Sequence, residues 1–238
     1  MAELNTGVTE RETMEYDVVI IGGGPSGLCS AIKLKQLSIK NGHELSVCVV
    51  EKGAEIGAHI LSGAVIDPKA FIELFPKVNL KDTPLKTKVK NDRFIFLTSK
   101  KSFGLPNFLL PPLMRNHGNY ITSLGNLCRW LSEEAEKLGV EIFPGFSVSD
   151  AVFDDDGSVI GVVTGDMGVS KNDEKKGSYE PGVALLSKYI IVAEGARGSL
   201  SKKLINKFSL DKHSDKPKFG LGLKELWEID PSMHELGK

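Results

Sequence analysis

The first strongly patterned stretch of the chain lies between Tyr16 and Leu37. An unbroken apolar run of β-branched residues extends from Val18 to Ile21 and predicts a buried parallel strand. From Leu28 to Leu34, apolar residues recur at helical spacing among polar neighbours, which predicts a helix. The glycine-rich residues 22–27 lie between these two elements. The pattern therefore predicts a strand, a tight turn and a helix in direct succession.

The residue types in this turn are those of a phosphate-binding turn, Gly22-Gly23-Gly24-Pro25-Ser26-Gly27. Gly22 would permit the tight turn, and Gly24 would allow a pyrophosphate to approach the backbone. Gly27 would let the helix pack closely on the strand. The free N–H groups at the positive end of the helix would then receive the phosphates.

A second apolar run, from Leu45 to Val50, predicts another strand, which is followed by Glu51 and Lys52. Glu51 lies somewhat more than about 20 residues beyond the glycine turn, where a partner for a ribose hydroxyl is expected. A glycine motif alone is weak evidence. Its position between a strand and a helix, with an acidic residue after the next strand, predicts a dinucleotide-binding unit.

Later patterns predict an α/β sheet with further strands and helices. The expected strands cover residues 93–98, 140–143, 148–153, 159–164, 189–192 and 218–228, and the expected helices cover 68–75, 124–138 and a segment capped by Ser199. Glu194 and Gly195 follow a strand and precede a helix, as the first glycine turn does. A doubly wound sheet gathers such turns at the carboxyl edge of its strands.

The segment from Phe103 to Met114 is apolar, contains three prolines and carries no charge. The prolines exclude a regular helix. Such a segment is either buried under another part of the protein or exposed as a patch that meets a bilayer surface or a partner. The residues alone leave both alternatives open.

Composition narrows the class of protein. The chain has 30 basic and 31 acidic residues, a balance that gives no support for a nucleic-acid partner. Three widely spaced cysteines, Cys29, Cys48 and Cys128, suit buried thiols in a reducing compartment better than a disulfide framework. No apolar run is long enough for a transmembrane helix. Residues 1–15 lack the pattern of a signal or transit peptide and are expected to form a flexible tail.

Several segments of the chain resemble the electron-transfer-flavoprotein:ubiquinone oxidoreductase family, a group of flavoproteins with the glutathione-reductase-type FAD-binding fold. They are DVVIIGGGPSGL, VVEKGAEIGAHILSGAVIDP, NHGNYITSLGNLCRWL, GVEIFPGF, VTGDMGV, AEGARGSL and GLGLKELWEID. The resemblance implies a Rossmann-like FAD-binding domain over residues 16–238, incomplete and with an inserted β-rich layer. It also implies that the chain stops before a C-terminal ferredoxin-like part.

The resemblance further implies the cofactor-binding residues. Ten residues are expected to bind FAD: Gly22, Gly24, Pro25, Ser26, Gly27, Glu51, Lys52, Arg129, Glu194 and Gly195. Within this set, Arg129 would reach the phosphate region of FAD. Glu194 and Gly195 match the second flavin turn of the family. Six apolar residues are expected to lie at a membrane surface: Phe103, Leu105, Phe108, Leu109, Leu110 and Leu113.

The function implied is electron transfer from reduced electron-transfer flavoprotein to ubiquinone, through FAD and a [4Fe–4S] cluster, without a catalytic nucleophile. The four cysteine ligands of the cluster are expected outside this chain. The implied location is the cytoplasmic face of a bacterial inner membrane, or alternatively the matrix face of the mitochondrial inner membrane. A flavin monooxygenase or a prenyl-chain reductase of the same fold remains an alternative, as does a non-catalytic fragment.

Overall fold

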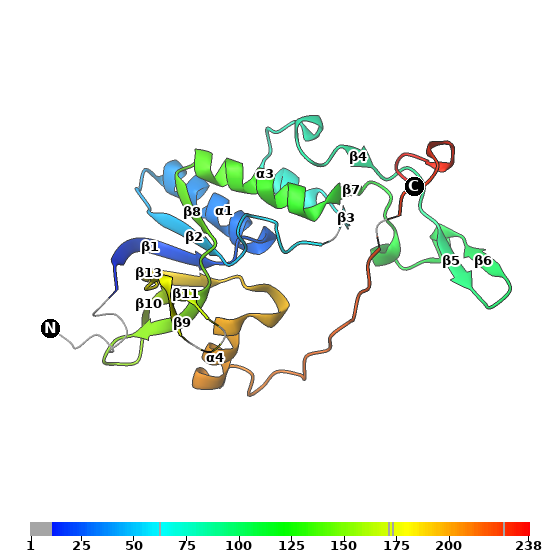
Figure 1. Cartoon of the computed structure of the whole chain (residues 1–238). Coiled ribbons are helices and arrows are strands. Elements are labelled where there is room, and N and C mark those ends of the chain that lie inside the picture. The colour runs from blue at the N-terminus through cyan, green and yellow to red at the C-terminus, as the bar shows by residue number, and fades with distance from the viewer. Residues whose placement is uncertain (1–10, 62, 171, 173, 226) are drawn as a thin grey trace. The chain divides into compact units, whose positions relative to one another are not determined.

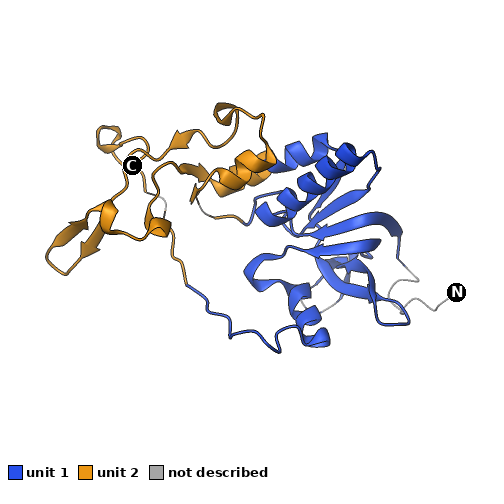
Figure 2. Cartoon of the chain, turned by 180° about the vertical axis from the view of Figure 1, so that it is seen from behind, with its two compact units in different colours: residues 1–59, 131–220 blue, residues 60–130, 221–238 orange. Residues whose placement is uncertain are grey.

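The computed structural model describes residues 11–238, except residues 62, 171, 173 and 226. The chain divides into two compact units, which Figure 2 shows in different colours. Unit 1 consists of residues 1–59 and 131–220, and unit 2 consists of residues 60–130 and 221–238.

Unit 1 is built on a six-stranded mixed sheet with the order β8-β2-β1-β13-β10-β9 (Figure 1). The first four strands in this order are mutually parallel, and β10 and β9 are added antiparallel. The strands are β1 (Thr13–Ile21), β2 (Val47–Glu51), β8 (Val140–Pro144), β9 (Val148–Phe153), β10 (Val159–Thr164) and β13 (Ala184–Val192).

Helices cover both faces of this sheet, as the apolar runs of its parallel strands require. Helix α1 (Pro25–Asn41) lies on the face that carries Ile20, and α4 (Ser199–Phe208) lies on the opposite face (Figure 1). On the α4 side, Val19, Ile21 and Val50 form one buried cluster with Leu200. The core of unit 1 therefore has two apolar layers, one on each side of β1 and β2.

Capping residues define the ends of two helices, and the predicted helix at 124–138 is confirmed. Helix α1 ends at Gly42, whose left-handed backbone (φ 67°) lets its N–H bond to the carbonyl of Ile39. Helix α3 (Leu124–Lys137) begins after Ser123, whose hydroxyl accepts a bond of 3.3 Å from the N–H of Asn126. Gly139, with φ 80°, follows its end. No described helix is long and apolar enough to cross a bilayer.

Strand β1 begins earlier than predicted. Residues Thr13–Glu15, expected in a flexible tail, pair with β13 in parallel register, because the sheet edge of β13 offers them backbone partners. Residues 1–10 of that predicted tail lie outside the described residues. Arg11, just before the strand, donates to the Asp166 carboxylate at 2.6 Å. The first residues of the described chain are thus held to the sheet.

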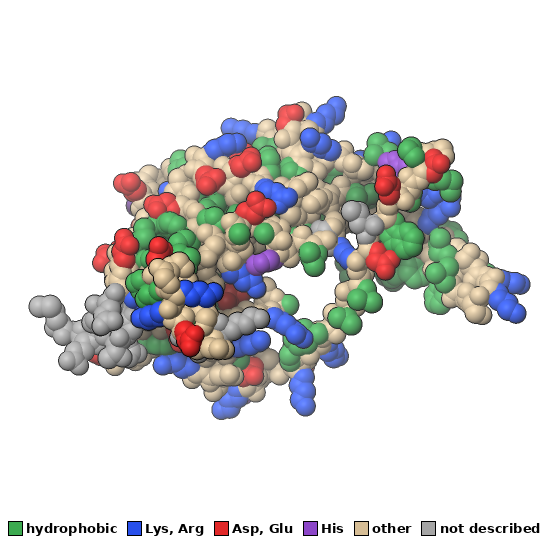
Figure 3. Space-filling view, in the orientation of Figure 1, with side chains coloured by type: hydrophobic (Ala, Val, Ile, Leu, Met, Phe, Trp, Pro, Cys, Tyr) green, Lys and Arg blue, Asp and Glu red, His purple; other side chains and the backbone are tan. Residues whose placement is uncertain are grey.

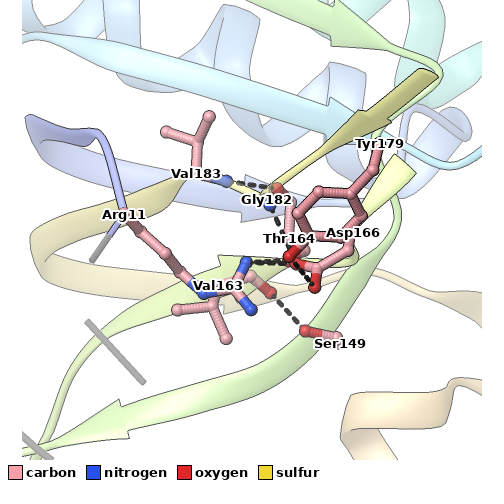
Figure 4. A network of polar contacts seen from close by, with 8 residues as sticks. All are labelled: Arg11, Ser149, Val163, Thr164, Asp166, Tyr179, Gly182 and Val183. Carbon is pink, nitrogen blue, oxygen red and sulfur yellow. Dashed lines mark hydrogen bonds and ion pairs between the residues drawn. The ribbon is translucent and has the colours of Figure 1, made fainter. Parts of the chain in front are cut away.

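Asp166 is the centre of a polar network beside β10 (Figure 4). Besides Arg11, its carboxylate accepts bonds from the hydroxyl of Tyr179 at 3.0 Å and the N–H of Gly182 at 2.9 Å. The bond from Gly182 and those from Arg11 and Tyr179 lower the pKa of Asp166, despite an opposing effect of burial. The network connects the start of β1 with the small hairpin of β11 (Met167–Val169) and β12 (Lys175–Glu180).

The cysteines behave as predicted for thiols outside a disulfide framework. Cys48 and Cys128 are buried, Cys29 is half-buried, and all three are free. Burial, with a smaller contribution from the nearby Glu141 carboxylate, raises the pKa of Cys48 to about 12. The Cys48 thiol therefore stays protonated at neutral pH and packs as a small apolar side chain.

The described part of unit 2 contains small sheets, one short α-helix and the first part of α3. Strands β3 (Gly63–Ile66), β7 (Tyr120–Ser123) and β4 (Thr87–Lys88) form one sheet, and β5 (Phe94–Leu97) and β6 (Ser102–Leu105) form a separate hairpin. Helix α2 (Lys69–Leu74) contributes Phe71 to a cluster of aromatic rings with Phe75 and Trp130, at centroid separations of 5.0 to 5.3 Å. This cluster supplies much of the buried aromatic surface of unit 2.

One predicted strand is absent from the described structure. The described residues of 218–228 adopt no regular element and are exposed. Their alternating pattern suits a strand with one buried face, but a strand also needs a neighbour for its backbone hydrogen bonds. None of the described strands pairs with this segment, so the prediction was wrong here.

Acid titration should weaken unit 1 through Asp17. Bonds from Lys188 at 2.6 Å and from the N–H and hydroxyl of Ser46 lower the pKa of Asp17 from 3.8 to about 2. Because the folded carboxyl has the lower pKa, its contribution to stability is complete above about pH 4 and is lost between about pH 4 and pH 2. We expect Asp17→Asn to show a smaller fall in the free energy of unfolding across this range, measured by urea denaturation.

Asp155, at the exposed tip of the β9–β10 hairpin, provides the control. Asp155→Asn should follow the acid dependence of the unmodified chain. Equal acid dependence in the Asp17 and Asp155 variants would contradict the assignment to Asp17.

Candidate functional site

The carboxyl ends of three parallel strands meet at one edge of the unit 1 sheet. The N–H of Gly22, after β1, bonds to the carbonyl of Val50 in β2 at 2.8 Å. The N–H of Ala193, after β13, bonds to the carbonyl of Ile21 at 2.8 Å. These bonds bring the glycine turn beside Glu51 and beside Glu194, which follow β2 and β13. The predicted juxtaposition of two glycine-containing turns is therefore present.

Two glycines of the turn are required by close backbone packing. Gly22 has φ 111°, and an added Cβ would collide with the carbonyl of Ala193. An added Cβ on Gly27 would collide with the carbonyl of Gly22, so α1 packs directly against the turn. The predicted roles of Gly22 in the turn and Gly27 in helix packing are confirmed by these contacts.

Gly24 differs from both, because a Cβ added there would meet no atom of the described chain within 4 Å. Gly24 is the N-cap of α1, and Pro25 occupies the first helical position. The amides of Ser26 and Gly27 belong to the first turn and lack carbonyls four residues earlier in the helix. Open space beside helix-end N–H groups, with no acidic side chain in that described turn, is suited to an anion such as a pyrophosphate.

Glu51 is held against the glycine turn by two backbone donors. One carboxylate oxygen accepts from the N–H of Gly23 at 2.8 Å, and the other accepts from the N–H of Gly53 at 2.7 Å. Glu51 is half-buried, and each oxygen keeps further acceptor capacity. The carboxylate is thus fixed in orientation and able to accept bonds from two ribose hydroxyls.

Sequence reasoning did not single out Gly23, Gly53 or Ile56, although all three shape this site. Ile56 is 7% exposed and covers Gly23, where an added Cβ would collide with its side chain. The one available signal was Gly23 itself, the middle one of three consecutive glycines, because the GxGxxG pattern does not require a glycine there. The loop after β2 therefore closes over the turn.

Glu194 has a structural role that the sequence did not predict. Its carboxylate accepts bonds from the N–H groups of Ser199, Leu200 and Ser201, at 2.7 to 3.2 Å, and from the Ser201 hydroxyl. Ser199, the predicted cap, is the first residue of α4, whose N-cap is Gly198 without a side-chain bond. Burial raises the pKa of Glu194, but these bonds outweigh it and the net pKa is lowered. Glu194 therefore stays ionised and caps α4.

Gly195 directly follows this capping residue. It has φ 75°, in the left-handed region, and a Cβ there would meet no described atom within 4 Å. Glu194 and Gly195 thus form a turn whose backbone is exposed beside the glycine motif. The Glu194 carboxylate holds the start of α4, and the side of the turn at Gly195 stays open to a ligand.

The family comparison follows this geometry. A family model described as "FAD binding domain" matches residues 15–220. The chain belongs to this family. The match includes the glycine turn, Glu51 and the Glu194–Gly195 turn, and it confirms FAD as the cofactor at the level of the family.

Curated relatives carry the resemblance further. The chain is 54% identical over 96% of its length to an electron transfer flavoprotein-ubiquinone oxidoreductase of Pseudomonas aeruginosa, covering 42% of that protein. It is 52% identical over 95% of its length to the mitochondrial protein of this name from Dictyostelium discoideum and 48% identical over 96% to that from Homo sapiens, covering 37% of each. The chain thus spans about two fifths of the length of these relatives.

Solved structures with the same fold are less similar in sequence. A p-nitrophenol 4-monooxygenase from Pseudomonas putida matches 81% of this chain and 44% of its own, with a TM-score of 0.54 and 22% identity. A geranylgeranyl bacteriochlorophyll reductase-like protein from Thermoplasma acidophilum matches 76% of this chain and 39% of its own, with a TM-score of 0.53 and 21% identity. These likenesses show the fold alone.

Two predicted cofactor residues are not explained by the geometry of this edge. Lys52 follows Glu51 and is exposed, and no described contact gives its side chain a role. Arg129 belongs to unit 2, where its guanidinium donates to the Asn126 side chain at 3.1 Å. Their roles stay predictions. Among the described residues, no group of three His, Cys, Asp or Glu side chains could hold a metal ion.

Five of the six predicted membrane-surface residues are exposed: Phe103 by 55%, Leu105 by 38%, Phe108 by 73%, Leu109 by 63% and Leu113 by 100%. Leu110 is only 6% exposed, so its prediction as a surface residue was wrong. The reason is local, because the chain turns at Leu110 between two short 3₁₀ turns, 107–109 and 112–114. One side chain of the segment packs inward and anchors the others.

The glycine turn allows a test based on paired substitutions. Gly27→Ala would force a Cβ against the Gly22 carbonyl and should lower the free energy of unfolding by about 3 kcal/mol or more. Gly24→Ala places its Cβ in open space and should change it by less than about 1 kcal/mol. Chemical denaturation of both variants measures the contrast, and equal losses would contradict the packing described here.

Proposed function

We propose that this chain binds FAD at the carboxyl edge of the unit 1 sheet and forms the flavin-binding part of an electron-transfer-flavoprotein:ubiquinone oxidoreductase. The observation that supports it most is the combination of open space at Gly24, the free helix-end amides and the oriented Glu51 carboxylate. The 48 to 54% identity to relatives of that name supports the specific chemistry over other members of the fold.

The residues at this edge suggest how the cofactor is held. The N–H groups of Ser26 and Gly27 would bind the pyrophosphate, and Pro25 would fix the start of the helix that carries them. Glu51 would accept bonds from the ribose hydroxyls of the adenosine. The exposed backbone at Gly195 would line the path of the cofactor beyond the phosphates.

The remaining assignments rest on the resemblance. Arg129 and Lys52 would supply positive charge near the cofactor phosphates. FAD, when bound, supplies redox chemistry that accepts and releases electrons singly or in pairs. The part of this chain is then to bind and orient the flavin, and it needs no nucleophile or general base.

For the whole protein we propose electron transfer from reduced electron-transfer flavoprotein to ubiquinone. The names of the relatives support both partners, and the resemblance adds a [4Fe–4S] cluster. A monooxygenase or a prenyl-chain reductase is the competing proposal, since solved structures of proteins related to both have this fold. Their 21 to 22% identity favours neither activity for this chain.

Flavin binding tests the proposal directly. The purified 238-residue chain should take up added FAD and show flavin absorption after removal of unbound cofactor. Gly24→Val should weaken FAD binding by roughly 100-fold or more, because its side chain would occupy the space proposed for the pyrophosphate.

Gly177 in β12 provides a matched control, since a Cβ there also meets no described atom within 4 Å. Gly177→Val should bind FAD as the unmodified chain does. A chain that stays colourless with excess FAD while remaining folded by circular dichroism would overturn the proposed function.

We further propose that the exposed apolar residues of 103–114 lie against a membrane. Polar contacts hold this segment in place: the guanidinium of Arg115 donates to the carbonyls of Leu110 and Phe108, at 2.9 and 3.0 Å. Asp92 accepts bonds from Asn116, and its carbonyl accepts a bond from the side chain of Asn107. A well-bonded backbone that turns large apolar side chains outward is typical of a contact surface.

The identity of the membrane is inferred from the relatives. The relatives include bacterial proteins and proteins named mitochondrial. We propose peripheral attachment to the cytoplasmic face of a bacterial inner membrane, with the matrix face of the mitochondrial inner membrane as the alternative.

Serine substitutions separate a contact surface from a core. Phe108→Ser with Leu109→Ser should weaken binding to phospholipid vesicles by about tenfold or more, and it should leave the free energy of unfolding nearly unchanged. Leu110→Ser should instead destabilise the chain by about 2 to 4 kcal/mol, because Leu110 is buried. Vesicle sedimentation and denaturation measure the two effects. A stability loss in the double variant without a loss of binding would show that the segment is core.

A further inference from the structure

The β5–β6 hairpin of unit 2 has one face made only of large apolar side chains. Phe94 lies opposite Leu105, and Phe96 lies opposite Phe103, in antiparallel register. Directly opposed residues, and residues two apart along a strand, share a face of the hairpin. Phe96 and Phe103 are 60% and 55% exposed. We call these four residues the aromatic face.

Most of the aromatic face is exposed, since only Phe94 of its four residues is half-buried. The two strands pair only with each other among the described strands, and a β-turn closes them through a bond of 2.8 Å between the N–H of Thr98 and the carbonyl of Lys101. The rings of Phe94 and Phe96 contact each other edge to face at a centroid distance of 6.1 Å. Exposed aromatic side chains on a hairpin of fixed register form a ready contact surface for an apolar partner.

The charged residues in the stretch of sequence that contains this hairpin are all basic. No aspartate or glutamate occurs between Arg93 and Ser132, although the whole chain has nearly equal numbers of acidic and basic residues. Lys100 and Lys101 lie at the exposed tip of the hairpin, and no described carboxylate lies within ion-pair distance of either. Figure 3 shows basic side chains at this end of unit 2.

Arg93, at the other end of the hairpin, is partly compensated. The hydrogen bond and charge of Lys238 lower the pKa of Glu235, and the charge of Arg93 adds a smaller contribution in the same direction. The uncompensated positive charge of the hairpin therefore lies at its tip, in Lys100 and Lys101. The hairpin presents aromatic side chains on one face and two cationic side chains at its end.

We propose that this hairpin selects anionic phospholipids, with the aromatic face at the headgroup and acyl boundary and the ammonium groups of Lys100 and Lys101 on lipid phosphates. This inference rests on the proposed membrane contact and adds the chemistry of the lipid. Aromatic rings favour the interfacial region of a bilayer, and lysine stems are long enough to reach the phosphates from it. A surface rich in anionic headgroups supplies the charge that the hairpin lacks.

The test compares vesicles of phosphatidylcholine alone with vesicles that also contain phosphatidylglycerol. The 238-residue chain should bind the anionic vesicles more tightly, and this preference should fall as salt is added. Lys100→Gln with Lys101→Gln should weaken binding to the anionic vesicles by roughly 25-fold, about fivefold per lysine, and leave binding to phosphatidylcholine unchanged.

The matched control is Lys202→Gln with Lys212→Gln, which removes the same charge from exposed positions in unit 1. This variant should keep the lipid preference. An equal loss in both double variants would overturn the proposal, because it would show only an effect of net charge.

The other outcomes separate this inference from the proposed membrane contact. Equally tight binding to both kinds of vesicle would leave the contact in place and overturn the lipid selectivity. Binding to neither, by a chain that is folded and takes up FAD, would overturn both and indicate a protein partner for this face. Flavin absorption, measured in parallel, reports the cofactor site independently of either result.

Discussion

The close contact between the start of α1 and the carbonyl of Gly22 is the constraint on which unit 1 depends. A side chain at Gly27 would occupy the position of that carbonyl, and one at Gly22 would occupy that of Ala193. Since Gly22 also bonds to β2, the turn joins three strands and a helix without intervening side chains. The same packing leaves open space at Gly24, beside the start of the helix. Compact packing and an anion site thus arise from one feature of the backbone.

The two glutamates at this edge, Glu51 and Glu194, have different roles. Both oxygens of Glu51 bond to N–H groups of the loops beside it, one of them in the glycine turn, so the carboxylate is oriented but keeps acceptor capacity. Glu194 accepts bonds from three successive amides at the start of α4 and from a hydroxyl. Its acceptor capacity is therefore largely used within the protein. Glu51 is the better candidate for direct ligand contact, and Glu194 holds the turn that includes Gly195.

Features that depend on neighbouring residues in the sequence were predicted correctly, and features that depend on distant partners were not. The glycine turn, the strand before Glu51 and the strands at 148–153 and 159–164 are defined by local residue types, and the structure confirms them. The extension of β1 to Thr13 depends on a partner strand far along the chain, at Ala184, which no local pattern reveals. The cap of α4 was misassigned for a related reason. Serine at the helix start is the common signal, but a carboxylate several residues earlier reaches the same amides.

The predicted strand at 218–228 shows the opposite error, in which a local pattern has no partner in the described structure. Alternation of apolar and polar residues describes what a strand would bury, but pairing decides whether it forms. The hairpin of β5 and β6 shows the converse case, in which strands pair without burying their apolar side chains. Its strands are paired and its turn is closed, yet Phe96 and Phe103 remain exposed.

Exposed apolar side chains on a backbone held by hydrogen bonds indicate a contact surface more strongly than those on an irregular segment. Leu110 packs inward, and Arg115 and Asp92 supply the bonds that fix the backbone around it. These contacts leave Phe108, Leu109 and Leu113 exposed to water. Apolar area exposed in this way opposes solubility unless another surface covers it. The absence of acidic residues from Arg93 to Ser132 supports the proposed anionic surface, since a positively charged apolar region is attracted to negative charge.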